Sequence, residues 1–209
     1  MTDQNELRVI HALRLKGFAD TPVVAEAAEV EVEVAASVLE ALAEAERARY
    51  REGRMTGWML MPDGRAHGEA LLAADLDAAG KRDRLDALYR RFLEHNQPFL
   101  RLCTEWQTRE VDGEQVVNDH TDAAYDDAVI RRLGETDEAM QAICLDLGQL
   151  LDRFAGYGPR FSAALSKVQA GDREWFTKPV IESYHTVWFE LHEDLLASLG
   201  IERAKEGHA

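Results

Sequence analysis

The sequence is poor in cysteine and has no long apolar run. Its 209 residues include two cysteines, Cys103 and Cys144, and neither belongs to a CxxC pair, so we expect buried thiols rather than a disulfide framework or a zinc site. No apolar stretch approaches the ~20 residues that span a bilayer. The N-terminus carries charges among its apolar positions and lacks a signal-peptide core. We therefore expect a cytoplasmic protein without a membrane partner.

Motifs for catalysis are also missing. The sequence contains no Gly-rich phosphate loop and no GxSxG elbow. No nucleophile, base and orienting residue can be assembled from the spacing of polar side chains. We therefore expect a protein that is not an enzyme and that needs no cofactor.

Positive charge is scarce, since the formal net charge is -15 and no Lys or Arg occurs between Gly17 and Arg47. This charge argues against non-specific binding of the whole molecule to nucleic acid, but it leaves room for a local basic patch. Such a patch follows at once, because four arginines fall within eight residues: Arg47, Arg49, Arg51 and Arg54.

Local patterns predict three helices and a hairpin in the first 80 residues. Apolar spacing gives a helix that ends at Gly17, a short helix from Thr21 to about Ala28, and a third helix. Thr21 is the expected N-cap of the second helix and Pro22 its first-turn proline. The third helix is expected to turn inward Val34, Val38, Leu39, Leu42 and Ala45. Strands are expected at 48–51 and 57–61, and a further helix at about 65–77.

This order resembles that of a winged helix-turn-helix. The run TPVVAEAAEVEVEVAASVLEALAEAERARYREGR looks like the helix-turn-helix and wing entry of MarR-like regulators, and Leu60 to Arg65 (LMPDGR) is similar to the family's LTPxGR ending. The resemblance covers about residues 5–78. It implies a DNA-binding domain over 1–79 that contacts double-stranded DNA through Ser37 on the third helix and through four wing arginines, Arg47, Arg49, Arg51 and Arg54.

The third helix departs from that pattern. Its expected outward residues are Glu33, Ala36, Ser37, Glu40 and Glu44, and glutamates repel the phosphates that line a groove. Three interpretations stay open. The protein binds DNA and depends on a dimer or a ligand; it binds a basic partner through this acidic face; or the winged fold is a structural module.

Residues 80–209 are predicted to form an α-helical bundle for dimerisation or effector binding, so the fold class is mostly α. This half resembles the tail of winged-helix regulators from high-GC, actinobacterial-type genomes. Pro98 is expected to kink a helix or to begin one, and a small hairpin is expected at Asp112-Gly113. Gly134 is expected to separate a helix ending near Leu133 from another over 140–154.

The run SYHTVWFELHEDLLASLG supplies candidate ligand contacts. His185 and His192 lie seven apart and so share one helix face. Three uses stay open: an apolar effector pocket, a metal site with His120, and a packed core or dimer interface. We assign no metal and expect a homodimer with a small-molecule effector. The ligand-binding candidates are Trp106, His120, Tyr184, His185, Trp188 and His192.

Overall fold

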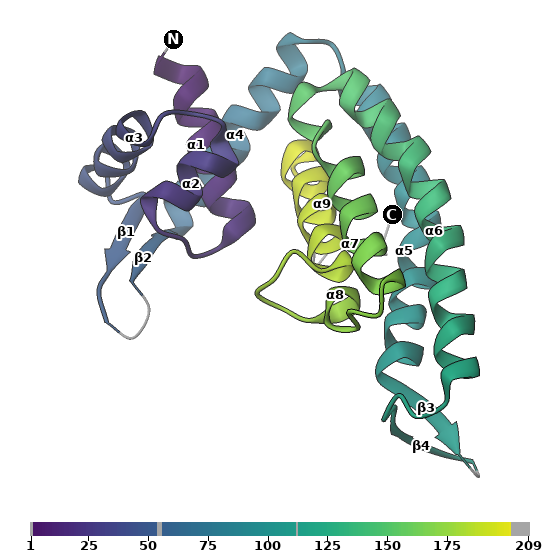
Figure 1. The fold of residues 1–209 in the computed structure, drawn as a ribbon. Helices are drawn as coiled ribbons and strands as arrows, with labels where there is room; N and C mark the ends of the chain where they lie inside the picture. The colour runs from purple at the N-terminus through teal and green to yellow at the C-terminus, as the bar shows by residue number, and fades with distance from the viewer. Residues whose placement is uncertain (1, 54–55, 112, 202–209) are drawn as a thin grey trace. The chain divides into compact units, whose positions relative to one another are not determined.

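The computed structural model describes residues 2–53, 56–111 and 113–201, and within them the chain is mostly helical with two small antiparallel hairpins (Figure 1). This confirms the mostly-α expectation. Contacts divide the chain into two compact units. One takes in the described residues up to Gly80 together with those from Glu193, and the other runs from Lys81 to His192. The predicted domains, 1–79 and 80–209, stay a prediction.

The first unit begins with three helices, α1 (Thr2–Lys16), α2 (Thr21–Ala28) and α3 (Val32–Glu44). The cap of α2 is one residue earlier than predicted. The Asp20 side chain accepts from the backbone N–H of Val23 at 3.1 Å, and the Thr21 hydroxyl instead accepts from Trp58 Nε1 at 3.0 Å. Glu29 ends α2 in the left-handed conformation, with φ 53°. At the other end of α2, the acidic N-cap Asp20 suits the positive N-terminal end of the helix dipole.

Apolar side chains of α1, α2 and α3 form one core. It includes Leu13, Val24, Leu39 and Leu42, each at most 2% exposed. On α3 the predicted inner face is right for Leu39 and Leu42 and wrong for Ala45, which is exposed beyond the helix end. The buried small residue is Ala35, one helical turn before Leu39.

A hairpin follows α3 and leads into another helix. Strands β1 (Ala48–Arg51) and β2 (Gly57–Leu60) pair antiparallel, with Tyr50 opposite Trp58. Ala19, in the loop after α1, adds a single bridge to Trp58 through hydrogen bonds of 3.2 and 2.7 Å. Helix α4 (Pro62–Ala78) then starts at a proline, as expected for a residue without a backbone N–H.

The second unit is built on two long helices, α5 (Arg82–Gln107) and α6 (Ala123–Leu150), joined through the hairpin β3 (Thr108–Val111) and β4 (Glu114–Val117) (Figure 1). A 3₁₀ turn (Asp152–Phe154), α7 (Tyr157–Gln169), the short α8 (Glu174–Thr177) and α9 (Tyr184–Leu199) complete the chain's described elements. The division between the units falls within α9.

Both long helices continue through residues that were expected to interrupt them. α5 continues through Pro98, so this proline does not begin a helix, and the alternative of a kink stays a prediction. α6 continues through Gly134, and the predicted separation into two helices was wrong. Packing explains this, because α6 buries Val129, Leu133 and Met140 at helical spacing on both sides of the glycine and so offsets its low helix propensity.

Both cysteines are buried in the second unit, Cys103 on α5 and Cys144 on α6. Burial raises the pKa of each thiol to about 12. A thiol that stays protonated at neutral pH is a poor nucleophile. Within the described residues no helix has the length and hydropathy needed to cross a membrane.

Candidate functional site

The outer face of the β1–β2 hairpin is basic. Alternation along β1 buries Ala48 and places Tyr50 beside Trp58, with ring centroids 5.0 Å apart. Arg49 and Arg51 alternate with these two residues along β1 and are exposed. They therefore share the opposite face of the hairpin, where a polyanion can reach them. Arg54 lies outside the described residues.

Arg47 has a different position, at the joint between α3 and the hairpin. Its guanidinium is half-buried and lies 3.9 Å from Glu6 Oε1, an oxygen that is also 2.8 Å from His67 Nε2. The backbone carbonyl of Arg47 accepts a hydrogen bond from the Met61 N–H at 2.9 Å. Arg47 is thus tied to its own unit and offers less free charge than Arg49 and Arg51.

The surface of α3 carries the opposite charge. Ser37 is exposed as predicted, and Ala36 is half-buried. Glu33, Glu40 and Glu44 are exposed around them. The first unit therefore presents a basic hairpin face and an acidic helix face as separate surfaces.

Three of the predicted ligand contacts are core residues of α9. Tyr184, Trp188 and His192 are at most 5% exposed. Trp188 stacks on Phe99 with ring centroids 4.0 Å apart, and its Nε1 donates to Asn96 Oδ1 at 2.9 Å. A buried indole N–H that finds a partner is typical of a packed core.

The other contacts of these residues follow the same pattern. The Tyr184 hydroxyl donates to Asp137 Oδ1 at 3.1 Å. His192 packs against Phe92, with centroids 5.1 Å apart. His185 is half-buried beside Phe99, and burial lowers its pKa, which keeps the imidazole neutral at pH 7.

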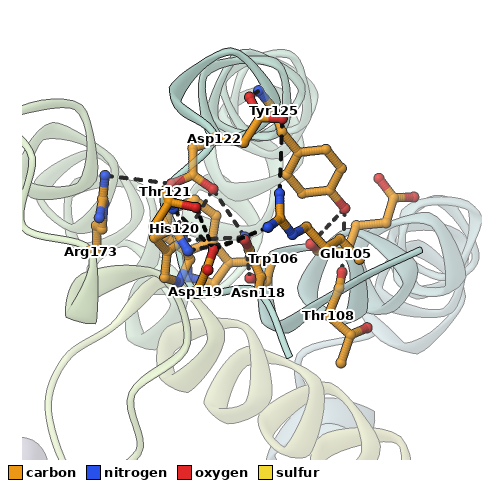
Figure 2. A network of polar contacts seen from close by, with 12 residues as sticks. Glu105, Trp106, Thr108, Asn118, Asp119, His120, Thr121, Asp122, Tyr125 and Arg173 are labelled. Atoms are coloured by element: carbon orange, nitrogen blue, oxygen red, sulfur yellow. Dashed lines mark hydrogen bonds and ion pairs between the residues drawn. The ribbon is translucent and has the colours of Figure 1, made fainter. Parts of the chain in front are cut away.

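Trp106 and His120 belong to a separate polar cluster beside the β3–β4 hairpin (Figure 2). Their rings lie 4.4 Å apart. His120 Nδ1 lies 3.1 and 3.0 Å from the two carboxylate oxygens of Asp126, and only 4% of the Asp126 side chain is exposed. Asn118 Nδ2 donates to the Trp106 carbonyl and to Asp126, at 3.1 and 3.0 Å.

These contacts indicate which ring nitrogen of His120 carries a hydrogen. Asn118 Nδ2 also lies 3.2 Å from His120 Nδ1, but both of its hydrogens have acceptors in Trp106 and Asp126. Because His120 Nδ1 faces the two oxygens of the Asp126 carboxylate, the geometry favours the tautomer in which Nδ1–H donates to Asp126. Arg173 adds an ion pair to the same carboxylate at 3.5 Å. Asp126 thus joins the start of α6 to the loop before it and to the segment beyond α7.

The structure brings the predicted ligand contacts together only in part. Tyr184, His185 and Trp188 share the Phe99 ring, whereas His120 faces Asp126 and Trp106. In residues 2–53, 56–111 and 113–201, no three His, Cys, Asp or Glu side chains are grouped to hold a metal ion.

Sequence reasoning missed two acids of α6. Asp126 and Asp137 occur in its buried stripe, at helical spacing with Val129, Leu133 and Met140. A carboxylate at a core position of an amphipathic helix was the available signal, because buried acids are rare unless they are partnered.

Searches of protein-family models, of curated proteins and of solved structures each found no match to this chain. The functional argument therefore rests on the residues and their geometry.

Proposed function

We propose that this protein is a DNA-binding transcription regulator of the MarR-like type. In this proposal α1, α2, α3 and the β1–β2 hairpin form a winged helix-turn-helix, and the hairpin is the wing. The supporting features are the element order and the Ala19 bridge, which acts as a minimal third strand. The second unit would provide dimerisation and effector binding, and no enzymatic chemistry or cofactor is required.

The observation that carries the proposal is the pair Arg49 and Arg51 on the open face of the hairpin. Two guanidiniums 2 residues apart on one strand face can follow a phosphate backbone. Ser37 is an exposed, uncharged side chain on α3 with a hydroxyl that can donate to or accept from a base edge.

The glutamates of α3 limit the strength of this contact. Repulsion between a carboxylate and a phosphate at contact distance costs about 1 kcal/mol in water. Glu33, Glu40 and Glu44 can therefore offset much of what Arg49 and Arg51 supply. A homodimer would double the number of wings on one operator, and we propose that state for the DNA-bound form.

Fluorescence anisotropy with a labelled duplex from upstream of the gene, and with a scrambled duplex, tests the proposal across a salt series. We expect tighter binding to the upstream duplex. The Arg49→Ala, Arg51→Ala double variant should weaken binding and reduce the salt slope by about 2, since each lost phosphate contact removes about 1. Arg101→Ala is the matched control, because Arg101 is an exposed arginine of α5.

The proposal is contradicted if the Arg49/Arg51 variant, the Arg101 variant and the natural sequence have the same duplex affinity and the same salt slope. Absence of binding to either duplex at low salt would also count against it. Light scattering at micromolar concentration tests the dimer, and a monomeric mass with and without duplex contradicts that part.

A second function is favoured by the acidic surface of α3. If Glu33, Glu40 and Glu44 form a docking face, the first unit is a protein-interaction module for a basic partner and does not bind DNA. Replacing the three glutamates with glutamine separates the two functions. The regulator should bind DNA more tightly after the change, whereas the interaction module should remain without DNA binding.

A further inference from the structure

A groove of about 520 Å³ runs between α6 and α7 in the second unit. Its volume falls in the range of sites for small organic ligands, ~300–1,000 Å³. The apolar wall is formed by Ile130 of α6 and Leu165 of α7. The remaining lining residues are polar or glycine: Asp127, Arg131, Gly134, Glu135, Asp137, Glu138 and Gln169.

Gly134, in the middle of α6, lies in the lining of the groove. Glycine in a helix costs ~0.5–1 kcal/mol relative to alanine. Gly134 has no packing reason for this cost, since a Cβ built there would meet nothing nearer than Gln169 Nε2 at 4.0 Å. A larger side chain at 134 would project into the space that the groove occupies.

A buried carboxylate lies in the lining of the groove. Asp137 is 7% exposed, and its Oδ1 accepts from Tyr184 and from Gln141, at 3.1 and 3.2 Å. Its Oδ2 has a weaker contact, 3.4 Å from Gln141 Nε2. Among the described residues no Lys, Arg or His acts on the Asp137 carboxylate. Its Oδ2 accepts one long hydrogen bond, from Gln141, and a carboxylate oxygen can accept a second bond from a donor in the groove.

The rim of the groove is also acidic. Asp127, Glu135 and Glu138 are exposed on α6, against the single guanidinium of Arg131. Carboxylates around a partly apolar space attract an organic cation and repel an anion.

We propose that this groove binds a small organic cation, an amine or amidine carried on an apolar body. Its charged group donates to Asp137 Oδ2, and its apolar body lies against Ile130 and Leu165 in the space left by Gly134. Tyr184 holds the Asp137 carboxylate from the core side. The role of this cation as the effector rests on the proposed regulator function, whereas its binding does not.

Isothermal titration calorimetry on the full chain tests the site with three cations: 2-phenylethylammonium, benzamidinium and spermidine. 2-Phenylethanol and phenylacetate are the neutral and anionic controls. We expect at least one of the cations to bind, and the matched alcohol and carboxylate to bind at least tenfold more weakly than 2-phenylethylammonium.

Variants then locate the site. Gly134→Leu should abolish binding and keep the helical circular dichroism, while Gly134→Ala should retain most of it. Asp137→Asn should weaken binding about tenfold to a hundredfold, the range for loss of a charged hydrogen bond. If Asp137→Asn does not fold, the Glu135→Gln, Glu138→Gln pair supplies the test, with a smaller expected loss of about threefold. Glu114→Gln on β4 is the charge-matched control and should bind normally.

Several outcomes would overturn the site: no binding of any of the three cations, equal binding of the alcohol, or binding that persists in Gly134→Leu. The proposed function fails separately. If the cation binds and the variants respond as expected while no duplex is bound, the site stands and the regulator role falls.

Discussion

Replacement of Gly64 by alanine is expected to disrupt the junction between the β1–β2 hairpin and α4. A Cβ built on Gly64 would lie 2.0 Å from the Arg47 carbonyl oxygen and 2.9 Å from its carbon. Both atoms are backbone, so no side-chain rotation can relieve the overlap. The first distance is about 1.5 Å short of an ordinary contact of ~3.5 Å, and either the start of α4 or the Arg47 backbone just before β1 has to move.

The magnitude follows from three contributions. Displacing the carbonyl weakens the Met61 N–H to Arg47 O bond, now 2.9 Å, at a cost of about 1 kcal/mol. Overpacking adds about 1–3 kcal/mol. Alanine offsets about 0.5–1 kcal/mol of this cost, because its helix propensity is higher than that of glycine. We expect a net destabilisation of about 2 kcal/mol, or about 4–8 °C in Tm for a chain of this size.

Urea unfolding and native-state hydrogen exchange of the full chain measure this effect. Exchange should accelerate at the Met61 amide and in the first turn of α4. Gly134→Ala is the matched control, because it makes the same change in a helix where the new Cβ has room. It should be neutral or stabilising by up to ~1 kcal/mol. Equal effects of the two substitutions would refute the close approach of Gly64 to Arg47.

Three further predictions concern the second unit. Trp188→Phe leaves the Asn96 carbonyl oxygen without its 2.9 Å donor and should lower the urea-unfolding free energy by about 1–3 kcal/mol; an unchanged midpoint would contradict the bond. Because burial raises the pKa of Cys103 and Cys144 to about 12, both thiols should react with a disulfide reagent at pH 8 only as fast as the protein unfolds, and rapid native labelling would contradict their burial. Burial also raises the pKa of Asp137, so the folded state holds this proton more tightly than the unfolded state. As pH rises from ~4 through the raised pKa, the natural protein should therefore lose stability relative to Asp137→Asn, and parallel stability curves would disprove the shift.

Local patterns in the sequence determined most of the helix and strand positions. β1 has the predicted bounds, Ala48–Arg51, and β2 ends at Leu60, one residue before the predicted end. The predicted helix from Thr21 to about Ala28 has the observed bounds of α2, but its cap is Asp20 and not Thr21, because both residues are good caps. Caps, turns and apolar spacing act over a few residues, which is why reading along the chain suffices for them.

The sequence also predicted which side chains of the first unit are exposed to solvent. Alternation along a strand and the helical period place Arg49, Arg51, Ser37 and the α3 glutamates outward, and the structure has them exposed. The same logic could not assign His120 or Trp188 to a pocket or to a core. Both uses require aromatic and polar side chains at the same spacing.

The tertiary structure alone decided which side chains meet. Neighbours distant in sequence bring Asp126 to His120 and Arg173, carry α6 through Gly134, and join Tyr184 to Asp137 across 47 residues. The sequence by itself determined a mostly helical chain with an arginine-bearing hairpin, because each of those features depends on neighbours a few residues away. The buried acids and the groove beside Gly134 depend on how α6 packs against α7 and α9, and the free energy of that packing is shared among residues that no local pattern connects.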